Sequence, residues 1–326
     1  MKKILGMGNA LTDILLQIDN DDILFSLNLM KGGMQLINTD RSEEISNAVS
    51  QYPKIMATGG SASNTINGIT RLGMNAGFVG KVGKDDIGLF FTNDSIFNGV
   101  EPHLLQSETP SGRCIVLVSP DSERTLCTYL GAACELLASD LTPELFHNYD
   151  IFHIEGYLVQ NHDLIRTAVS LAKQEGLTVS IDLASYNVVE ENLDFLHEII
   201  KDYVDIVFAN EEEARAFTGK EPEEALNYIS ELCDIAIVKV GKDGSYIKSG
   251  TEKIQITARL ANCIDTTGAG DLYASGFLFG LANNFSFEVC GKIGSLVSGN
   301  VVEVLGAKMQ DEVWTEIHAE VKRIVN

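Results

Sequence analysis

Residues 265–271 read DTTGAGD, and the apolar run LYASGFLFGLANN follows directly at 272–284. The run predicts a helix, and the two glycines place flexible backbone at its start. Free amides at a helix N-terminus attract anions, so the amides of residues 268–270 would form an anion site. An acid beside a bound anion is repulsive unless it accepts a proton there, which suggests a general base at Asp271. The alternative is that Asp271 only complements the helix dipole.

Apolar strands alternate with amphipathic helices between residues 151 and 240. The strands are nearly continuous apolar runs, and helices end at glycines such as Gly176 and Gly219. This pattern is typical of βαβ units around a buried parallel sheet. We therefore expect an α/β fold with a central, mostly parallel sheet between helices.

Two segments, 14–38 and 111–130, interrupt the alternation because they look β-rich and lack a helical period. The turn-forming residues 119–124 lie between two alternating runs and predict a hairpin. We expect a single domain over residues 1–326 in which both segments form a small accessory sheet. Edge strands of the main sheet are the alternative.

The chain carries a net charge of −22, which repels nucleic acid backbones and anionic membrane surfaces. We expect neither as a partner. Its six cysteines show no C-x-x-C spacing, which favours reduced thiols in a cytoplasmic protein over disulfides or zinc. The N-terminal segment is a poor signal peptide because glycines, Asn9 and Asp13 interrupt its apolar run.

A second glycine-rich stretch, GMGNAL at 6–11, follows the first predicted strand. It resembles part of a dinucleotide fingerprint, but position 11 is leucine instead of the third glycine, and the residues that follow look extended. A nicotinamide-dependent dehydrogenase is therefore a weak alternative. The sequence contains no G-x-x-x-x-G-K-[ST] phosphate loop.

Taken together, several motifs resemble those of the ribokinase-like (PfkB) carbohydrate kinases, a family that includes adenosine kinase. DTTGAGD resembles the C-terminal signature, and GGSASNTINGITRLG at 59–73 resembles the N-terminal one. GFVGKVGKDDIG at 77–88 resembles the segment that follows, and NEEE at 210–213 fits N-x-x-E. The matches occur in the family's order and extend from about residue 4 to about residue 307.

The resemblance implies a three-layer α/β/α core with a small β lid, for which 14–38 and 111–130 are the candidates. It also implies ATP as phosphoryl donor, Mg²⁺ as its partner ion, and the primary hydroxyl of a sugar as acceptor. Adenosine or another purine nucleoside is the alternative acceptor, and a non-catalytic sugar or nucleotide sensor is a further reading. An exposed lid edge would allow a homodimer.

A purine would need apolar or aromatic lid residues around it. The candidates for that lining are Leu16, Met34, Leu36, Leu126 and Tyr129. The same side chains could instead seal the lid sheet.

By resemblance, Asp271 would accept the proton of the attacking hydroxyl. The amides of Gly268, Ala269 and Gly270 would stabilise charge on the transferred phosphoryl group. The residues that match acceptor-binding positions are Asp13, Asn9, Gly59, Gly60 and Asn64. A carboxylate such as Asp13 suits a pair of vicinal hydroxyls, and glycines let a sugar lie against the backbone.

The residues that match nucleotide-binding positions are Asn210, Lys239, Gly241, Gly244 and Asn300. The family commonly has threonine or serine where Lys239 stands, so that contact departs from the pattern. Asn210 could equally be an ordinary N-cap, and Asn300 could serve only in packing.

Glu213 matches the acid that helps to hold Mg²⁺ through water. Asp265 and Thr267 match positions that bind K⁺ in some family members, where carbonyl groups near Val302 and Gly306 would complete the site. Arg124, in the predicted hairpin, could reach substrate or phosphate, or could simply be solvated.

Overall fold

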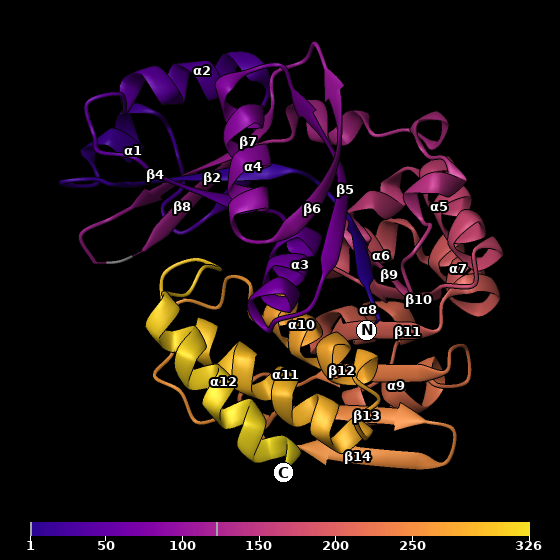
Figure 1. Ribbon diagram of the computed structural model, residues 1–326. Helices are drawn as coiled ribbons and strands as arrows, with labels where there is room; N and C mark the ends of the chain where they lie inside the picture. Colours follow the sequence, from indigo (N-terminus) through magenta and orange to yellow (C-terminus); the bar gives the residue numbers. More distant parts are fainter. Residues whose placement is uncertain (1, 122) are drawn as a thin grey trace.

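The computed structural model describes residues 2–121 and 123–326, so Met1 and Ser122, which fall in the predicted segments 1–326 and 111–130, lie outside it. In the described part of the chain, the main sheet has nine strands in the order β14-β13-β12-β11-β10-β9-β1-β5-β6 (Figure 1). The strands are β1 Ile4–Met7, β5 Ala76–Gly83, β6 Val100–Ser107, β9 Ile151–Glu155, β10 Thr178–Asp182, β11 Ile206–Asn210, β12 Ile235–Lys239, β13 Ser245–Ser249 and β14 Glu252–Ile256. All pairings are parallel except those of β13 with β12 and β14.

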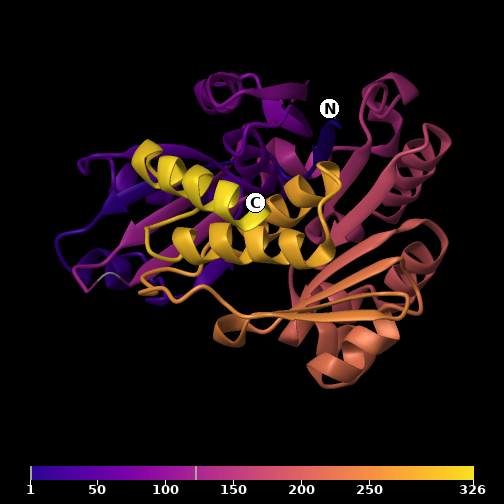
Figure 2. The ribbon, with the colours of Figure 1, turned by 60° about the horizontal axis from the view of Figure 1, so that its bottom comes forward.

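Helices cover both faces of this sheet. One face packs against α5 His162–Gln174, α6 Tyr186–Glu191, α7 Leu193–Tyr203, α8 Glu211–Thr218 and α9 Pro222–Ile229. The other packs against α3 Ser61–Arg71, α4 Asp86–Phe97, α10 Ala269–Ala282 and α11 Phe287–Val301, and α12 Asp311–Val325 lies outside them. Figure 2 shows α10, α11 and α12, orange to yellow, next to one another. The helices predicted between residues 151 and 240 are all present.

A smaller sheet forms beside the main one, in the order β3-β8-β7-β2-β4. Its strands are β2 Leu11–Gln17, β3 Met34–Leu36, β4 Ile55–Gly59, β7 Gly112–Val118 and β8 Arg124–Tyr129. One face packs against α1 Asp22–Ser26 and α2 Thr39–Ala48 (Figure 1). The predicted α/β fold, with a large mostly parallel sheet and a smaller sheet, is confirmed.

The extents predicted for the accessory segments need correction. Segment 14–38 contains the helix α1, whose five residues are too few to show a helical period in the sequence. The smaller sheet also includes β4, which was not predicted and which leads directly into the GGSASN turn. None of the described strands from either segment joins the main sheet.

Polar side chains gather at the carboxyl edge of the parallel strands. β9 ends at Glu155, β10 at Asp182, β11 at Asn210 and β12 at Lys239. The register pairs Glu155 with Asp182, and Asn210 with Lys239. Ligands of open α/β sheets bind at this edge, so the fold places the candidate site here.

No helix in residues 2–121 and 123–326 is long and apolar enough to cross a membrane.

Helix α10 is fixed in place by its close contact with α11. A Cβ atom at Gly276 would lie 2.7 Å from the Ile293 carbonyl oxygen and 2.8 Å from the Gly294 backbone. These neighbours are main-chain atoms, so they cannot rotate away as a flexible side chain could. The position of α10, and of the residues at its start, therefore depends on a glycine at 276.

We predict that Gly276→Ala lowers the free energy of unfolding by about 1–3 kcal/mol, because the added methyl must push the two helices apart. Urea unfolding measures the change. Glu316→Ala, on the exposed face of α12, serves as the control and should stay within about 0.5 kcal/mol of the wild type. Equal unfolding midpoints for Gly276→Ala and the wild type would disprove the close contact.

Candidate active site

The DTTGAGD stretch forms the start of α10, as predicted. Gly268 is the N-cap residue with φ 76°, a left-handed conformation that favours glycine. The Ala269 amide donates to the Thr266 carbonyl oxygen at 3.1 Å, so the predicted anion site loses one of its three amides to a local turn. The amides of Gly268 and Gly270 make no such bond within the described residues.

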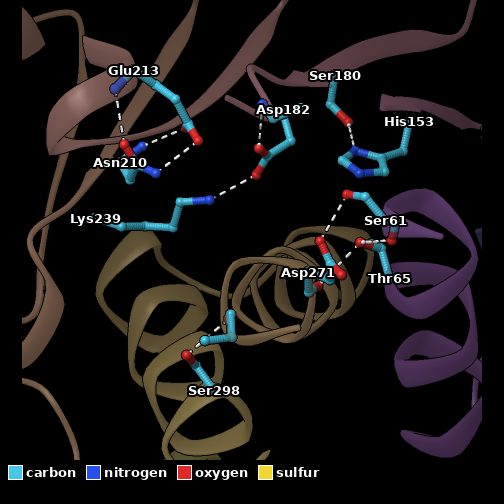
Figure 3. Close-up of polar contacts among 12 residues, drawn as sticks. Ser61, Thr65, His153, Ser180, Asp182, Asn210, Glu213, Lys239, Asp271 and Ser298 are labelled. Atoms are coloured by element: carbon cyan, nitrogen blue, oxygen red, sulfur yellow. Dashed lines mark hydrogen bonds and ion pairs between the residues drawn. The ribbon is translucent and has the colours of Figure 1, made fainter. Parts of the chain in front are cut away.

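Asp271 lies at the junction of α10 and α3 and is partly buried. Its carboxylate accepts a hydrogen bond from Ser61 Oγ at 2.7 Å (Figure 3). It accepts another from Asn64 Nδ2 at 3.0 Å. Thr65 Oγ1 donates to its main-chain oxygen at 3.1 Å. Burial raises the pKa of Asp271 to about 6, although the bonds from Asn64 and Ser61 lower it. At neutral pH the carboxylate is ionised yet basic enough to take a proton.

Asp13 and the two glycines of the GGSASN turn lie together. A Cβ atom at Gly59 would lie 2.6 Å from the Asp13 carboxylate, and one at Gly60 would lie 2.2 Å from the Asn9 carbonyl oxygen. Gly60 also has φ 91°. Burial raises the pKa of Asp13 to about 6, while Lys308 and Arg124 lower it. The structure thus brings these four predicted acceptor residues together, with Asn64 beside Asp271.

Asn9, predicted to line the acceptor site, is mainly engaged with a residue that the sequence analysis missed. Glu155 accepts hydrogen bonds from the Asn9 amide at 3.1 Å, from Asn9 Nδ2, and from the Ala62 amide at 3.0 Å. Burial raises the pKa of Glu155 to about 7 despite these donors. Glu155 joins the end of β9 to the loop after β1 and to the start of α3. Its place at the end of a predicted parallel strand was the available signal.

Lys239 points toward the start of α10 and forms an ion pair with Asp182. Its Nζ lies 2.7 Å from Asp182 Oδ2, and the two side chains are only 14% and 7% exposed (Figure 3). A Cβ atom at Gly270 would lie 2.9 Å from Nζ. Burial opposes the charge of Lys239, but Asp182 and Glu213 outweigh it and raise its pKa. The pair holds an ammonium group beside the Gly270 backbone, and Asp182 is a second residue that the sequence analysis missed.

Asn210 and Glu213 form a reciprocal cap at the start of α8. The Asn210 side chain accepts from the Glu213 amide at 2.9 Å, and Glu213 accepts from the Asn210 amide and Nδ2, each at 2.7 Å. Burial, and then the nearby Asp182 charge, raise the pKa of Glu213 to about 7. The N-cap alternative for Asn210 therefore describes a real contact, and it holds Glu213 on the side of Asp182 and Lys239.

The other predicted nucleotide residues have structural contacts of their own. A Cβ atom at Gly244 would lie 1.8 Å from the Ile256 carbonyl oxygen, so the neighbouring strand end requires this glycine. Gly241 has φ 53° and open space around it. Asn300 is buried on α11, and its Nδ2 donates to the Leu296 carbonyl oxygen at 2.8 Å.

Asp265 has partners on both carboxylate oxygens. It accepts from the Thr267 amide at 3.0 Å, from Thr267 Oγ1 at 2.7 Å and from the Gly306 amide at 2.7 Å, and it pairs with Arg124 of β8. Burial works against ionisation, but the bonds from Gly306 and Thr267 hold the pKa of Asp265 below its ordinary value. The Val302 carbonyl, predicted as a K⁺ ligand, accepts the amides of residues 264 and 265.

The GMGNAL stretch does not have the geometry of a dinucleotide site. β1 is followed by β2, not by a helix, so the GMGNAL stretch lacks the helix that a dinucleotide site requires. Within the described residues, no group of three or more His, Cys, Asp or Glu side chains is arranged to hold a metal ion. Asp182 and Glu213 still offer hard oxygen atoms, which suits Mg²⁺ held mostly by phosphates and water.

An α/β protein with a basic aspartate, free helix-start amides and an ammonium at its carboxyl edge has the parts of a phosphoryl-transfer enzyme. The pfkB family carbohydrate kinase model matches residues 34–313, so the chain belongs to this family. It is accordingly a sugar or nucleoside kinase, a phosphotransferase with an alcohol group as acceptor. Kinases of this family use ATP with Mg²⁺.

Similar proteins include both sugar and adenosine kinases. The structure of adenosine kinase from Sinorhizobium meliloti is 35% identical, with 98% of this chain and 99% of that chain covered and a TM-score of 0.86. A probable sugar kinase from Rhizobium etli is 34% identical, with 99% and 98% covered and a TM-score of 0.86. An uncharacterised sugar kinase from Archaeoglobus fulgidus is 26% identical, over 74% of this chain and 96% of the relative.

We predict that the Lys239–Asp182 pair is coupled. Asp182→Asn should destabilise the fold by about 3 kcal/mol, because it leaves a buried ammonium without its counter-charge. Asp182→Asn combined with Lys239→Met should recover much of that loss. Urea unfolding of the two single variants and the double variant closes the cycle. Losses that simply add would show that the two charges act independently.

Proposed function

We propose that the protein transfers the γ-phosphoryl group of ATP to the primary hydroxyl (CH₂OH) of a sugar, with Asp271 as general base. The observation that supports this most directly is the position of Asp271. Its carboxylate is held by Ser61 and Asn64 at the start of α10, beside the free amides of Gly268 and Gly270. Asp13 and Gly59 lie alongside, where a sugar could rest against the backbone.

In the proposed reaction, the acceptor hydroxyl gives its proton to the Asp271 carboxylate as its oxygen attacks the γ-phosphorus. The new O–P bond forms while the bond to the β–γ bridging oxygen breaks, and ADP leaves with that electron pair. The amides of Gly268 and Gly270, with the Lys239 ammonium, stabilise negative charge on the transferred group. Catalysis of this kind rests on positioning and electrostatics.

Mg²⁺, when bound, neutralises phosphate charge during the transfer. Glu213 and Asp182 are the residues that would hold it, through water. Their two carboxylates lie beside Lys239, whose ammonium is next to the Gly270 backbone where the transferred phosphoryl group would sit. Asn210 keeps Glu213 in that orientation. The K⁺ prediction for Asp265 and Thr267 remains open to test, since K⁺ could use Asp265 only if Arg124 moved away. Comparing turnover in K⁺, Na⁺ and choline buffers tests it.

A purine nucleoside is the second candidate acceptor, and the smaller sheet supplies the observation in its favour. Asp13 faces the site, so strand alternation and cross-strand pairing put Leu15, Val116 and Leu126 on the same face. Such an apolar surface suits a base ring. Two residues considered for this lining lie on the opposite face: Leu16 packs against α1 and α2, and Tyr129 bonds to Thr39.

The smaller sheet would act as the lid of this site. Arg124 already joins β8 to the loop before α10, which is the contact that a closed lid would make. Closure would exclude water, which otherwise competes as a phosphoryl acceptor. β3 is an edge strand of this sheet, and its outer main-chain groups could pair with a second copy in a homodimer.

The test of the function is ADP formation from MgATP with pentoses, hexoses and ribonucleosides, each supplied singly. A free sugar or nucleoside that is phosphorylated at its CH₂OH group supports the proposal and decides between the two acceptors. The proposal would be ruled out if none of these compounds supported ADP formation, or if the phosphoryl group went to a secondary hydroxyl.

We predict that Asp271→Asn lowers kcat by about 10²–10⁴-fold, because an amide cannot accept the proton. ATP binding should stay near the wild-type value, measured by titration calorimetry. Asp86→Asn is the matched control, because Asp86 is also an acid in the first turn of a helix, α4. It should leave kcat unchanged. If the Asp271→Asn variant were fully active, Asp271 would not be the general base and would only complement the helix dipole.

We also predict an acid limb in the pH profile of kcat/KM for the acceptor. The pKa of Asp271 is raised to about 6, and only its ionised form can accept a proton. Activity should therefore be complete above this value and fall as the pH drops through it. The pKa of Asp13 is also raised to about 6, so the acid limb reports on the two carboxyls together. A profile that stays level down to about pH 5 would argue against an ionised base.

A further inference from the structure

Lys308 lies at the candidate site, although the sequence analysis gave it no role. It follows Gly306 and Ala307 in the segment between α11 and α12. Ala307 lies against the start of α10, since a Cβ atom at Gly268 would be 2.6 Å from its Cβ. The Lys308 Nζ atom is buried and has no hydrogen-bond partner among the described residues. A buried ammonium without a partner is costly, so its persistence calls for an explanation.

The charges of three carboxylates act on this ammonium. Burial lowers the pKa of Lys308 to about 8, while the charges of Asp94, Asp13 and Asp271 oppose that change and Arg71 adds to it. Asp94 accepts a hydrogen bond from Thr58 Oγ1 at 2.8 Å, and Asp271 is held by Ser61 and Asn64. Within residues 2–121 and 123–326, Lys308 forms no ion pair with any of these three carboxylates.

The site also contains unused hydrogen-bond acceptors. In the described residues, burial and the charges of Lys308 and Arg124 act on the Asp13 carboxylate, with no hydrogen bond among these influences. The buried Asn64 Oδ1 has no partner there. Together with Lys308 Nζ, these atoms offer one strong donor and two acceptors near Asp271. A ligand that satisfies them must donate and accept at neighbouring atoms, as adjacent hydroxyl groups do.

We propose that Lys308 donates a hydrogen bond to a ring hydroxyl of the acceptor, and that this hydroxyl in turn donates a hydrogen bond to the Asp13 carboxylate. This inference rests on the proposed function and narrows its substrate class. Arg124 and Arg71, the other cations that act on this cluster, are paired with Asp265 and Asp311. One ammonium is therefore left for three carboxylates, and the surroundings keep a net negative charge that repels acceptors carrying a carboxylate or phosphate. The carboxylates therefore favour a neutral polyhydroxylated acceptor, and the Lys308 ammonium gains its missing partner only when that acceptor binds.

The test compares Lys308→Met with the wild type, using Lys292→Met as the control. Lys292 is a surface residue, 51% exposed, that pairs with Glu288 on α11. Melting temperatures are recorded without ATP, in the presence of pentoses, hexoses and ribonucleosides, and of aldonic acids and sugar phosphates as their anionic counterparts. A bound acceptor stabilises the fold by mass action. KM is then measured for ATP and for any acceptor that is phosphorylated.

Neutral acceptors should raise the melting temperature of the wild type and of Lys292→Met, but hardly that of Lys308→Met. KM for the acceptor should rise about tenfold or more in Lys308→Met, while KM for ATP changes less than about twofold. Without ligand, Lys308→Met should melt no lower than the wild type, since removing an unpaired buried charge relieves a cost. Lys308→Gln, which keeps an N–H donor, should show a smaller rise in KM.

Three outcomes would overturn the role of Lys308: an unchanged KM for the acceptor, a marked loss of melting temperature in ligand-free Lys308→Met, or stabilisation of the wild type by anionic sugars alone. Failure of the proposed function looks different. If neutral polyols bind in a Lys308-dependent manner but none is phosphorylated, the role of Lys308 in binding stands and the kinase mechanism falls.

Discussion

The close crossing of α3 and α10 is the constraint on which the site depends. A Cβ atom at Gly68 would lie 2.5 Å from Ser275 Oγ and 2.8 Å from the Leu272 side chain, so the helices can approach only because this residue is glycine. The approach brings Ser61 and Asn64 to Asp271, from positions more than 200 residues away in the sequence. Glycines thus determine which side chains meet here, and those side chains determine the chemistry.

Charge at the carboxyl edge is balanced closely, with acids in excess. Asp13, Glu155, Glu213 and Asp271 all have raised pKa values, in each case first through burial. Three cations lie near them: Lys239, Lys308 and Arg124. These are too few to neutralise both the carboxyls and a nucleoside triphosphate. A metal ion that accompanies the phosphates would offset this excess of negative charge, in line with the family's use of Mg²⁺.

Much of this architecture could be predicted from the sequence because its signals are local. Apolar strands, glycine-terminated helices and the DTTGAGD stretch each lie within a few residues, and they indicated the fold class and the place of Asp271. Glu155 and Asp182 were missed because an acid at the end of a strand resembles any loop residue. Their importance appears only when parallel strands are aligned side by side.

Other features could not be predicted because they depend on contacts between distant segments. Lys308 resembles an ordinary surface lysine in the sequence, and only the packing of its segment against α10 buries it. The pairing of Asp265 with Arg124 of β8, 141 residues away in the sequence, has no local signal either. The short helix α1 and the strand β4 were missed because five residues show little periodicity.

Unsatisfied polar atoms in the described part of the chain are concentrated where a ligand would bind. Three of the five buried polar side-chain atoms without a partner are Asn64 Oδ1, Arg124 Nε and Lys308 Nζ, all near Asp271 or its loop. Each costs stability in the empty protein. A neutral acceptor that satisfied Asn64 and Lys308 would remove part of that cost on binding. The ligand that stabilises the fold most should therefore be the one that forms hydrogen bonds with these unsatisfied groups.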